Sequence, residues 1–149
     1  MLDEQIRRVL LSYEPLWEEK ELNIDLALEA TQIYGSKSLL AQVWSNLIDN
    51  AIKFSRPGGT LFISCGVFDG KIVVRIRDTG VGMSEEVRKH AFDKFYQGER
   101  SHSGQGSGLG LALVQRIVSL SGGSVDLQSR EGKGTEITVS LKNEQEMSA

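Results

Sequence analysis

Cysteine, proline and histidine are scarce in this chain of 149 residues, and it has no long hydrophobic run. The single cysteine, Cys65, excludes an internal disulfide and has no metal-ligand partner nearby, which favours a reducing compartment. No window approaches the roughly 18 apolar residues of a membrane span, and the first residues lack the pattern of a signal peptide. We therefore expect a soluble, cytoplasmic domain without direct membrane contact, although its parent protein can still be anchored in a membrane.

An excess of positive charge is also missing. Lys and Arg number 17 against 20 Asp and Glu, for a net charge of −3, and the longest basic stretch is a pair. Binding to nucleic-acid phosphates needs clustered Lys and Arg, so we expect no nucleic-acid partner. The length suits one domain, because about 150 residues can bury roughly 70% of the surface that the unfolded chain exposes.

The apolar periodicity predicts an α+β protein. A two-layer α/β sandwich is expected, in which three helices cover one face of a mixed, mostly antiparallel sheet. We expect a single domain over 1–142 and a flexible tail over 143–149. The predicted helices span 2–19, 38–54, 84–90 and 108–120, and the predicted strands span 22–28, 60–68, 71–77, 124–129 and 135–141. Asp69-Gly70 joins the second and third strands, because this pair tolerates the positive φ angles of a tight hairpin.

Three polar residues follow one edge of the second predicted helix. Asn46, Asn50 and Lys53 stand at i, i+4 and i+7 and can face a common ligand. A polar surface edge is the ordinary interpretation, yet asparagine is a weak helix former, so helix stability explains the pair poorly. An amide oxygen suits Mg²⁺ that also holds phosphate oxygens and water, and a lysine one turn away can neutralise phosphate charge.

A second motif, Arg77 to Met83, follows the hairpin. A carboxylate at Asp78 accepts hydrogen bonds only, so it would accept the exocyclic amine of adenine and repel the carbonyl of guanine. Gly80 and Gly82, which lack Cβ, would let a flat ring approach the backbone. Alone, the motif is more often a turn that ends a strand.

A third motif has glycines at alternate positions, from Gly104 to Leu111. Free backbone amides and the positive end of a helix dipole make such a segment suited to phosphates. Its spacing fits neither the dinucleotide fingerprint nor a Walker loop. A flexible linker is the alternative, although a linker would not lead directly into an apolar helix. We expect the three motifs to converge around one purine nucleotide.

These residues resemble the catalytic, ATP-binding domain of bacterial sensor histidine kinases, which has a Bergerat-type ATP-binding fold. The resemblance covers nearly the whole chain and rests on five boxes in order. They are the asparagine box Asn46–Phe54, the first glycine box around Asp78, Gly80 and Gly82, the phenylalanine box around Phe92 and Phe95, the second glycine box Gly106–Gly110, and Gly132-Lys133-Gly134-Thr135.

The resemblance implies a role for each box. Asn50 would bind Mg²⁺, Lys53 would contact phosphate, and Asp78 would hold adenine. Residues 97–107 would form a lid over ATP, and Phe92 and Phe95 would anchor that lid. The remaining nucleotide-binding residues implied are Gly80, Gly82, Gly106, Gly108, Leu109, Gly110 and Thr135. Arg100 and His102 could reach the γ-phosphate, but exposed loop charges are more often solvated.

Two departures from the family bear on function. The phosphate-accepting histidine belongs to a dimerisation domain, and neither His90 nor His102 stands in such a setting. The first family strand would precede Leu2. We therefore expect a monomeric module that binds Mg²⁺-ATP, works with its own dimerisation domain and a response regulator, and transfers little phosphate by itself.

We expect Asn46 and Lys53 to act in catalysis. Related ATPases have a glutamate at the position of Asn46, where it activates water, and a neutral amide cannot take that proton. Transfer of the γ-phosphoryl group to a histidine Nε2, across a surface near Phe92 and Phe95, is therefore favoured over hydrolysis. Two alternatives stay open: a serine kinase of the anti-sigma-factor type, and a non-catalytic module that signals nucleotide occupancy.

Overall fold

The structure is a computed structural model that describes residues 1–93 and 110–143. The predicted lid over 97–107, with Arg100 and His102, lies outside the described residues. So do Phe95, Gly106, Gly108 and Leu109, and all of the predicted tail except residue 143.

The described strands form one five-stranded sheet with the order β1-β2-β3-β5-β4. β1 pairs with β2 in parallel, and the other three pairs are antiparallel. The strands are β1 (Asn23–Leu28), β2 (Thr60–Phe68), β3 (Lys71–Asp78), β4 (Ser124–Arg130) and β5 (Gly134–Lys142). The predicted mixed, mostly antiparallel sheet is confirmed.

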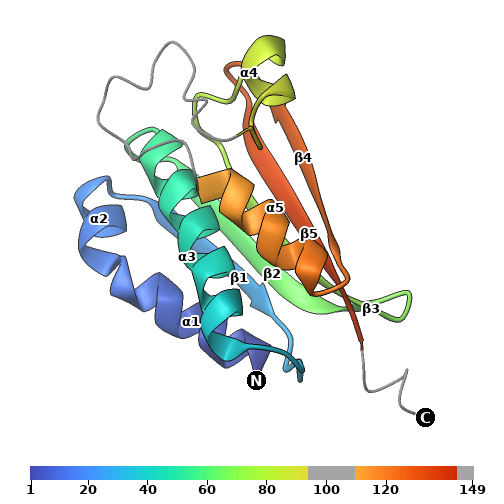
Figure 1. Ribbon diagram of the computed structural model, residues 1–149. Helices are drawn as coiled ribbons and strands as arrows, with labels where there is room; N and C mark the ends of the chain where they lie inside the picture. Colours follow the sequence, from blue (N-terminus) through green and yellow to red (C-terminus); the bar gives the residue numbers. More distant parts are fainter. Residues whose placement is uncertain (94–109, 144–149) are drawn as a thin grey trace.

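Helices α1, α3 and α5 lie across one face of this sheet, as Figure 1 shows. The helices are α1 (Leu2–Ser12), α2 (Glu14–Glu19), α3 (Lys37–Phe54), α4 (Glu85–Lys89) and α5 (Gly110–Leu120). The core lies between the two layers, where Ile6, Trp44 and Val118 are 0% exposed. This confirms the two-layer α/β sandwich. Among the described residues, no helix is both long and apolar enough to cross a bilayer.

Helix α3 is the central element because apolar residues occupy a broad stripe along it. Seven of its side chains are buried: Leu40, Val43, Trp44, Leu47, Ile48, Ala51 and Ile52. Ser36 caps its first turn by accepting a hydrogen bond from the Leu39 N–H. The hairpin after it has the expected turn, with φ of 51° at Asp69 and 74° at Gly70.

The first predicted helix is wrong in one respect, because the chain forms two helices over 2–19. Helix α1 ends at Ser12, and α2 begins at Glu14 with proline in its first turn. Pro15 has no N–H to donate to the carbonyl of Leu11, so the helix cannot continue through it. The Trp17 indole instead donates to the Leu10 carbonyl at 3.1 Å, which connects α2 to the last turn of α1.

Candidate functional site

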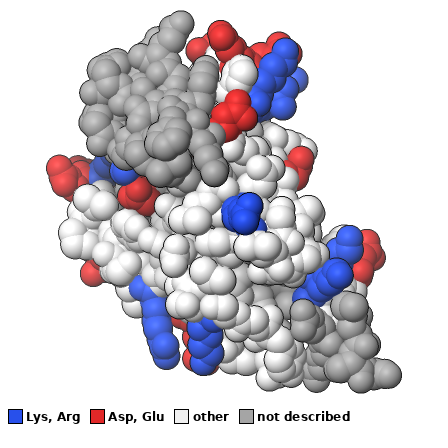
Figure 2. All heavy atoms as spheres, in the orientation of Figure 1, with Lys and Arg blue, Asp and Glu red and all other residues white. Residues whose placement is uncertain are grey.

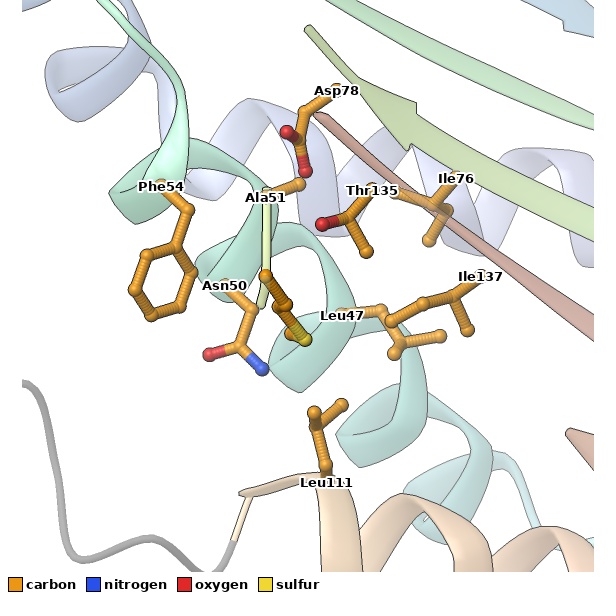
Figure 3. A pocket seen from close by; sticks show the side chains of 10 residues that line it. Leu47, Asn50, Ala51, Phe54, Ile76, Asp78, Leu111, Thr135 and Ile137 are labelled. Atoms are coloured by element: carbon orange, nitrogen blue, oxygen red, sulfur yellow. The ribbon is translucent and has the colours of Figure 1, made fainter. Parts of the chain in front are cut away.

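One pocket lies between α3 and the ends of β3 and β5. Figure 3 shows its lining: Leu47, Asn50, Ala51 and Phe54 of α3, Ile76 and Asp78 of β3, Met83, Leu111 of α5, and Thr135 and Ile137 of β5. Asp78 and Thr135 point into the pocket from the sheet, and Asn50 points into it from α3, on the side nearer Leu111. Two of the three predicted motifs therefore face one space, between otherwise apolar walls.

Asp78 is the charged group of this pocket and is only 5% exposed. Its Oδ1 accepts a hydrogen bond from the Gly80 N–H at 2.9 Å, and the Thr135 N–H is a second backbone donor. Burial raises the pKa of Asp78 to about 6, above the ordinary 3.8, although these donors and the Lys20 ammonium act in the opposite direction. A buried acceptor of this kind suits an exocyclic amine.

Lys20, the residue that follows α2, reaches the carboxyl end of α3. Its Nζ donates to the carbonyls of Ile52, Lys53 and Ser55 at 2.8, 2.8 and 3.0 Å. Partial burial lowers the pKa of Lys20, and the Asp78 carboxylate raises it. The ammonium therefore lies at the negative end of the α3 dipole, close enough to Asp78 for the two charges to interact.

Backbone packing accounts for the glycines that surround Asp78. A Cβ on Gly80 would lie 2.0 Å from the Phe54 carbonyl oxygen, and one on Gly82 would lie 1.9 Å from that of Arg130. A Cβ on Gly134 would lie 2.1 Å from the carbonyl oxygen of Asp78. These close approaches fix the turn after β3 against α3 and the end of β4, and the start of β5 against the end of β3. Contact of Gly80 and Gly82 with a nucleotide stays a prediction.

The three polar residues of α3 have different surroundings. No protein group bonds the side chain of Asn50 in the described part of the chain, and this side chain faces the pocket. Asn46 donates from Nδ2 to the Gln42 carbonyl at 2.8 Å. The Lys53 ammonium does not line the pocket and pairs with Asp49 at 2.9 Å.

Thr135 and Gly110 lie at the two sides of the site. Thr135 is 8% exposed, and its Oγ1 hydrogen-bonds with the Ser129 hydroxyl at 2.8 Å. Gly110 is the first residue of α5, and a Cβ there would lie 3.3 Å from Oδ1 of Asn46. The second glycine box therefore ends beside the asparagine box.

Phe92 is partly buried against the core, and its role as an anchor of the lid stays a prediction. Just before it, His90 Nδ1 and Asp93 Oδ2 lie 2.7 Å apart.

Cys65 is 4% exposed in β2, and burial raises the pKa of its thiol, so the structure places it in the core.

The pocket offers few protein ligands to a Mg²⁺ ion. The residues that the structure describes contain no group of three or more His, Cys, Asp and Glu side chains that could hold a metal ion. Mg²⁺ bound with a nucleotide does not need such a cage, because phosphate oxygens and water supply most of its ligands. The amide oxygen of Asn50, which bonds to no group among the residues that the structure describes, fits this mode.

Sequence reasoning missed Lys20, Met83 and Ser129. Lys20 belongs to the charged stretch Glu18–Glu21, which is typical of a solvated surface, so no local signal marks it. Ser129 donates to the Gly134 carbonyl and accepts from the Met83 N–H, and both contacts depend on strand pairing that composition does not show.

Charge is mixed on the helix-covered face. Figure 2 shows acidic and basic side chains around its margin and mostly uncharged atoms across its middle.

Comparison with known proteins defines the class. Residues 35–145 match the family described as histidine kinase-, DNA gyrase B-, and HSP90-like ATPase, and the chain belongs to this family. A curated relative is the sensor protein SrrB of Staphylococcus aureus, 36% identical over 126 residues that cover 78% of this chain and 22% of SrrB. The chain thus spans less than a quarter of that relative.

Two solved structures support the same class. The mycobacterial sensor histidine kinase MprB matches with a TM-score of 0.81 and 29% identity, over 94% of each chain. Full-length ShkA, solved in complex with AMPPNP, matches with a TM-score of 0.81 and 28% identity, over 95% of this chain and 30% of ShkA. The fold is that of the catalytic domain of a sensor histidine kinase.

Proposed function

We propose that this chain binds ATP with Mg²⁺ and transfers the γ-phosphoryl group to a histidine on a separate dimerisation domain, in two-component signalling. The observation that carries the proposal is the shared pocket, in which the buried carboxylate of Asp78 and the amide of Asn50 face one space. The AMPPNP complex of ShkA adds support from a relative of similar fold.

Adenine is the base that fits the Asp78 end of the pocket. The carboxylate accepts from the exocyclic amine, and the apolar walls from Leu47, Ile76 and Ile137 contact the ring. Guanine would place a carbonyl oxygen against a buried negative charge, which is unfavourable. This geometry supports selectivity for ATP over GTP.

The phosphate end lies toward Asn50 and the start of α5. Asn50 would hold Mg²⁺, which when bound neutralises charge on the phosphates. Lys53 exchanges its contact with Asp49 for the phosphates, and Gly110 provides a backbone N–H group at the start of α5. Phosphate contacts of Gly106, Gly108 and Leu109, which lie outside the described residues, stay a prediction. Thr135 supports Asp78 through its backbone N–H.

Transfer is favoured over hydrolysis by the residue at position 46. Asn46 holds the Gln42 carbonyl, and a neutral amide cannot remove a proton from water. In the proposed reaction the bond between the γ-phosphorus and the bridging oxygen breaks, ADP leaves, and a new bond forms to Nε2 of the incoming histidine. Positioning and charge neutralisation provide the catalysis.

The test is phosphoryl transfer to a sensor-kinase dimerisation hairpin. The chain is mixed with the hairpin and radiolabelled ATP, with Mg²⁺ or EDTA, and the product is exposed to acid. We expect Mg²⁺-dependent label that acid removes, as phosphohistidine requires, and a loss of label in Asn50→Ala. Acid-stable label would indicate a serine kinase instead, and ATP binding without any transfer would indicate a non-catalytic module.

A further inference from the structure

The carboxyl end of α3 is held by donors from several elements. The Ser55 hydroxyl donates to the Ala51 carbonyl at 2.6 Å, and the Val81 N–H donates to that of Phe54 at 3.1 Å. Lys20 donates to the carbonyls of Ile52, Lys53 and Ser55. One turn of α3 is thereby connected both to the end of α2 and to the backbone just after Asp78.

We propose that Lys20 is a positioning residue of the nucleotide site, which holds the last turn of α3 and the Asp78 carboxylate in one arrangement through its ammonium group. The inference rests on the proposed function and extends it to a residue outside every recognised box. Lys20 lines no part of the pocket and acts through α3 and Asp78.

The chemistry of an ammonium group suits this place. The last carbonyls of a helix lack intrahelical partners and form its negative pole, and an ammonium has three N–H donors. Lys20 uses all three on carbonyls that span Ile52 to Ser55. A neutral side chain would leave these carbonyls without a charged donor and would loosen the turn that also contacts Val81.

The Lys20 ammonium also acts on Asp78 through its charge, although the two groups form no direct ion pair in the described part of the chain. The positive charge of Lys20 favours the ionised form of Asp78. The other side chains that line the pocket come from α3, β3, β5, α5 and Met83, and all of them are uncharged. The charged neighbours on β3 and β5, Arg77 and Glu136, stand opposite each other in the strand register, on the other face of the sheet. With Arg130 and Lys133 they line a second hollow at the strand ends, which Asp78 also borders. Lys20 therefore raises the fraction of Asp78 that is ionised at a given pH and can accept a hydrogen bond.

The test compares ATP binding of Lys20→Met, Lys20→Arg and wild type across pH by calorimetry. In Lys20→Met we expect affinity about fivefold below wild type at pH 6 and within about twofold at pH 8, because only the ionised fraction of Asp78 binds adenine. Lys20→Arg keeps a positive charge and should follow the wild-type profile. Lys71→Met is the control, because Lys71 is exposed at the far end of β3.

A readout without nucleotide separates this inference from the proposed function. The carboxyl ¹³C shift of Asp78 is followed by NMR during a pH titration of the ligand-free protein. We expect its midpoint to move to higher pH in Lys20→Met and to stay in place in Lys20→Arg and Lys71→Met. If wild type binds no ATP, the proposed function fails, and this titration still decides the role of Lys20.

Two results would contradict the proposed role of Lys20. The first is an unchanged midpoint of the Asp78 titration in Lys20→Met. The second is a loss of ATP affinity that is equal at pH 6 and pH 8, since a change in packing alone would produce a loss that does not depend on pH. If thermal melting shows that Lys20→Met does not fold, Lys20→Gln replaces it, because its amide keeps two N–H donors without the charge.

Discussion

Replacing Asp78 with asparagine should stabilise the folded protein while it removes the base acceptor. Asp78 is 5% exposed, and burial raises its pKa to about 6 from the ordinary 3.8. A shift of roughly two pKa units corresponds to about 3 kcal/mol of differential free energy for the ionised form. The amide oxygen of asparagine can still accept from the Gly80 N–H. We therefore expect Asp78→Asn to gain about 1–3 kcal/mol in the free energy of unfolding at neutral pH.

The pKa shift of Asp78 also determines how the predicted difference in stability changes with pH. The pKa of Asp78 is higher in the folded protein than in the unfolded chain, so the folded state binds more protons between about pH 4 and pH 6. Wild-type stability therefore falls as pH rises through this window. The asparagine variant has no such proton, so its advantage should be near zero at about pH 4 and complete by about pH 7.

Urea unfolding at several pH values, followed by tryptophan fluorescence, measures the difference, since Trp44 is 0% exposed in the folded protein. Asp25→Asn is the matched control, because Asp25 is exposed on β1 and should show no comparable gain. Lower stability of Asp78→Asn at neutral pH would refute the reasoning, as would a difference that does not change with pH.

Two further predictions concern the elements that position the site. Gly80→Ala should lower the free energy of unfolding by about 3 kcal/mol or more, because its Cβ would lie 2.0 Å from the Phe54 carbonyl oxygen. Gly58→Ala is the control, because nothing lies within 4 Å of the new Cβ. Its positive φ should lower the free energy of unfolding by only about 1–2 kcal/mol. Equal losses in urea unfolding would contradict this. Ser36→Ala should lower the unfolding free energy by about 1 kcal/mol, because it removes the cap on the Leu39 N–H, and Ser36→Asp should restore it.

Much of the fold could be predicted because its signals are local. The apolar stripe of α3 and the Asp69-Gly70 turn each depend on a few neighbouring residues, and both are confirmed. The break at Tyr13 was missed because the apolar period continues through Pro15 although the backbone hydrogen bonds do not.

The site was harder to predict because it depends on distant segments. Asp78 and Asn50 could be singled out by residue type, and the structure brings them into one pocket. The contacts of Lys20 join residues 32 to 35 positions apart, and no local pattern reports them. The suggestion that Gly80 makes room for a flat ring could not anticipate the Phe54 carbonyl, which the fold alone places there.

The central claim is that one pocket holds the base at Asp78 and the metal-bound phosphates at Asn50. Calorimetry of ATP and GTP, each with and without Mg²⁺, tests it on wild type, Asp78→Asn and Asn50→Ala. We predict that wild type prefers ATP, that Asp78→Asn loses this preference but keeps the gain from Mg²⁺, and that Asn50→Ala loses that gain but keeps the preference. If both substitutions changed the same property, or neither changed any, the two residues would not serve one nucleotide in this way.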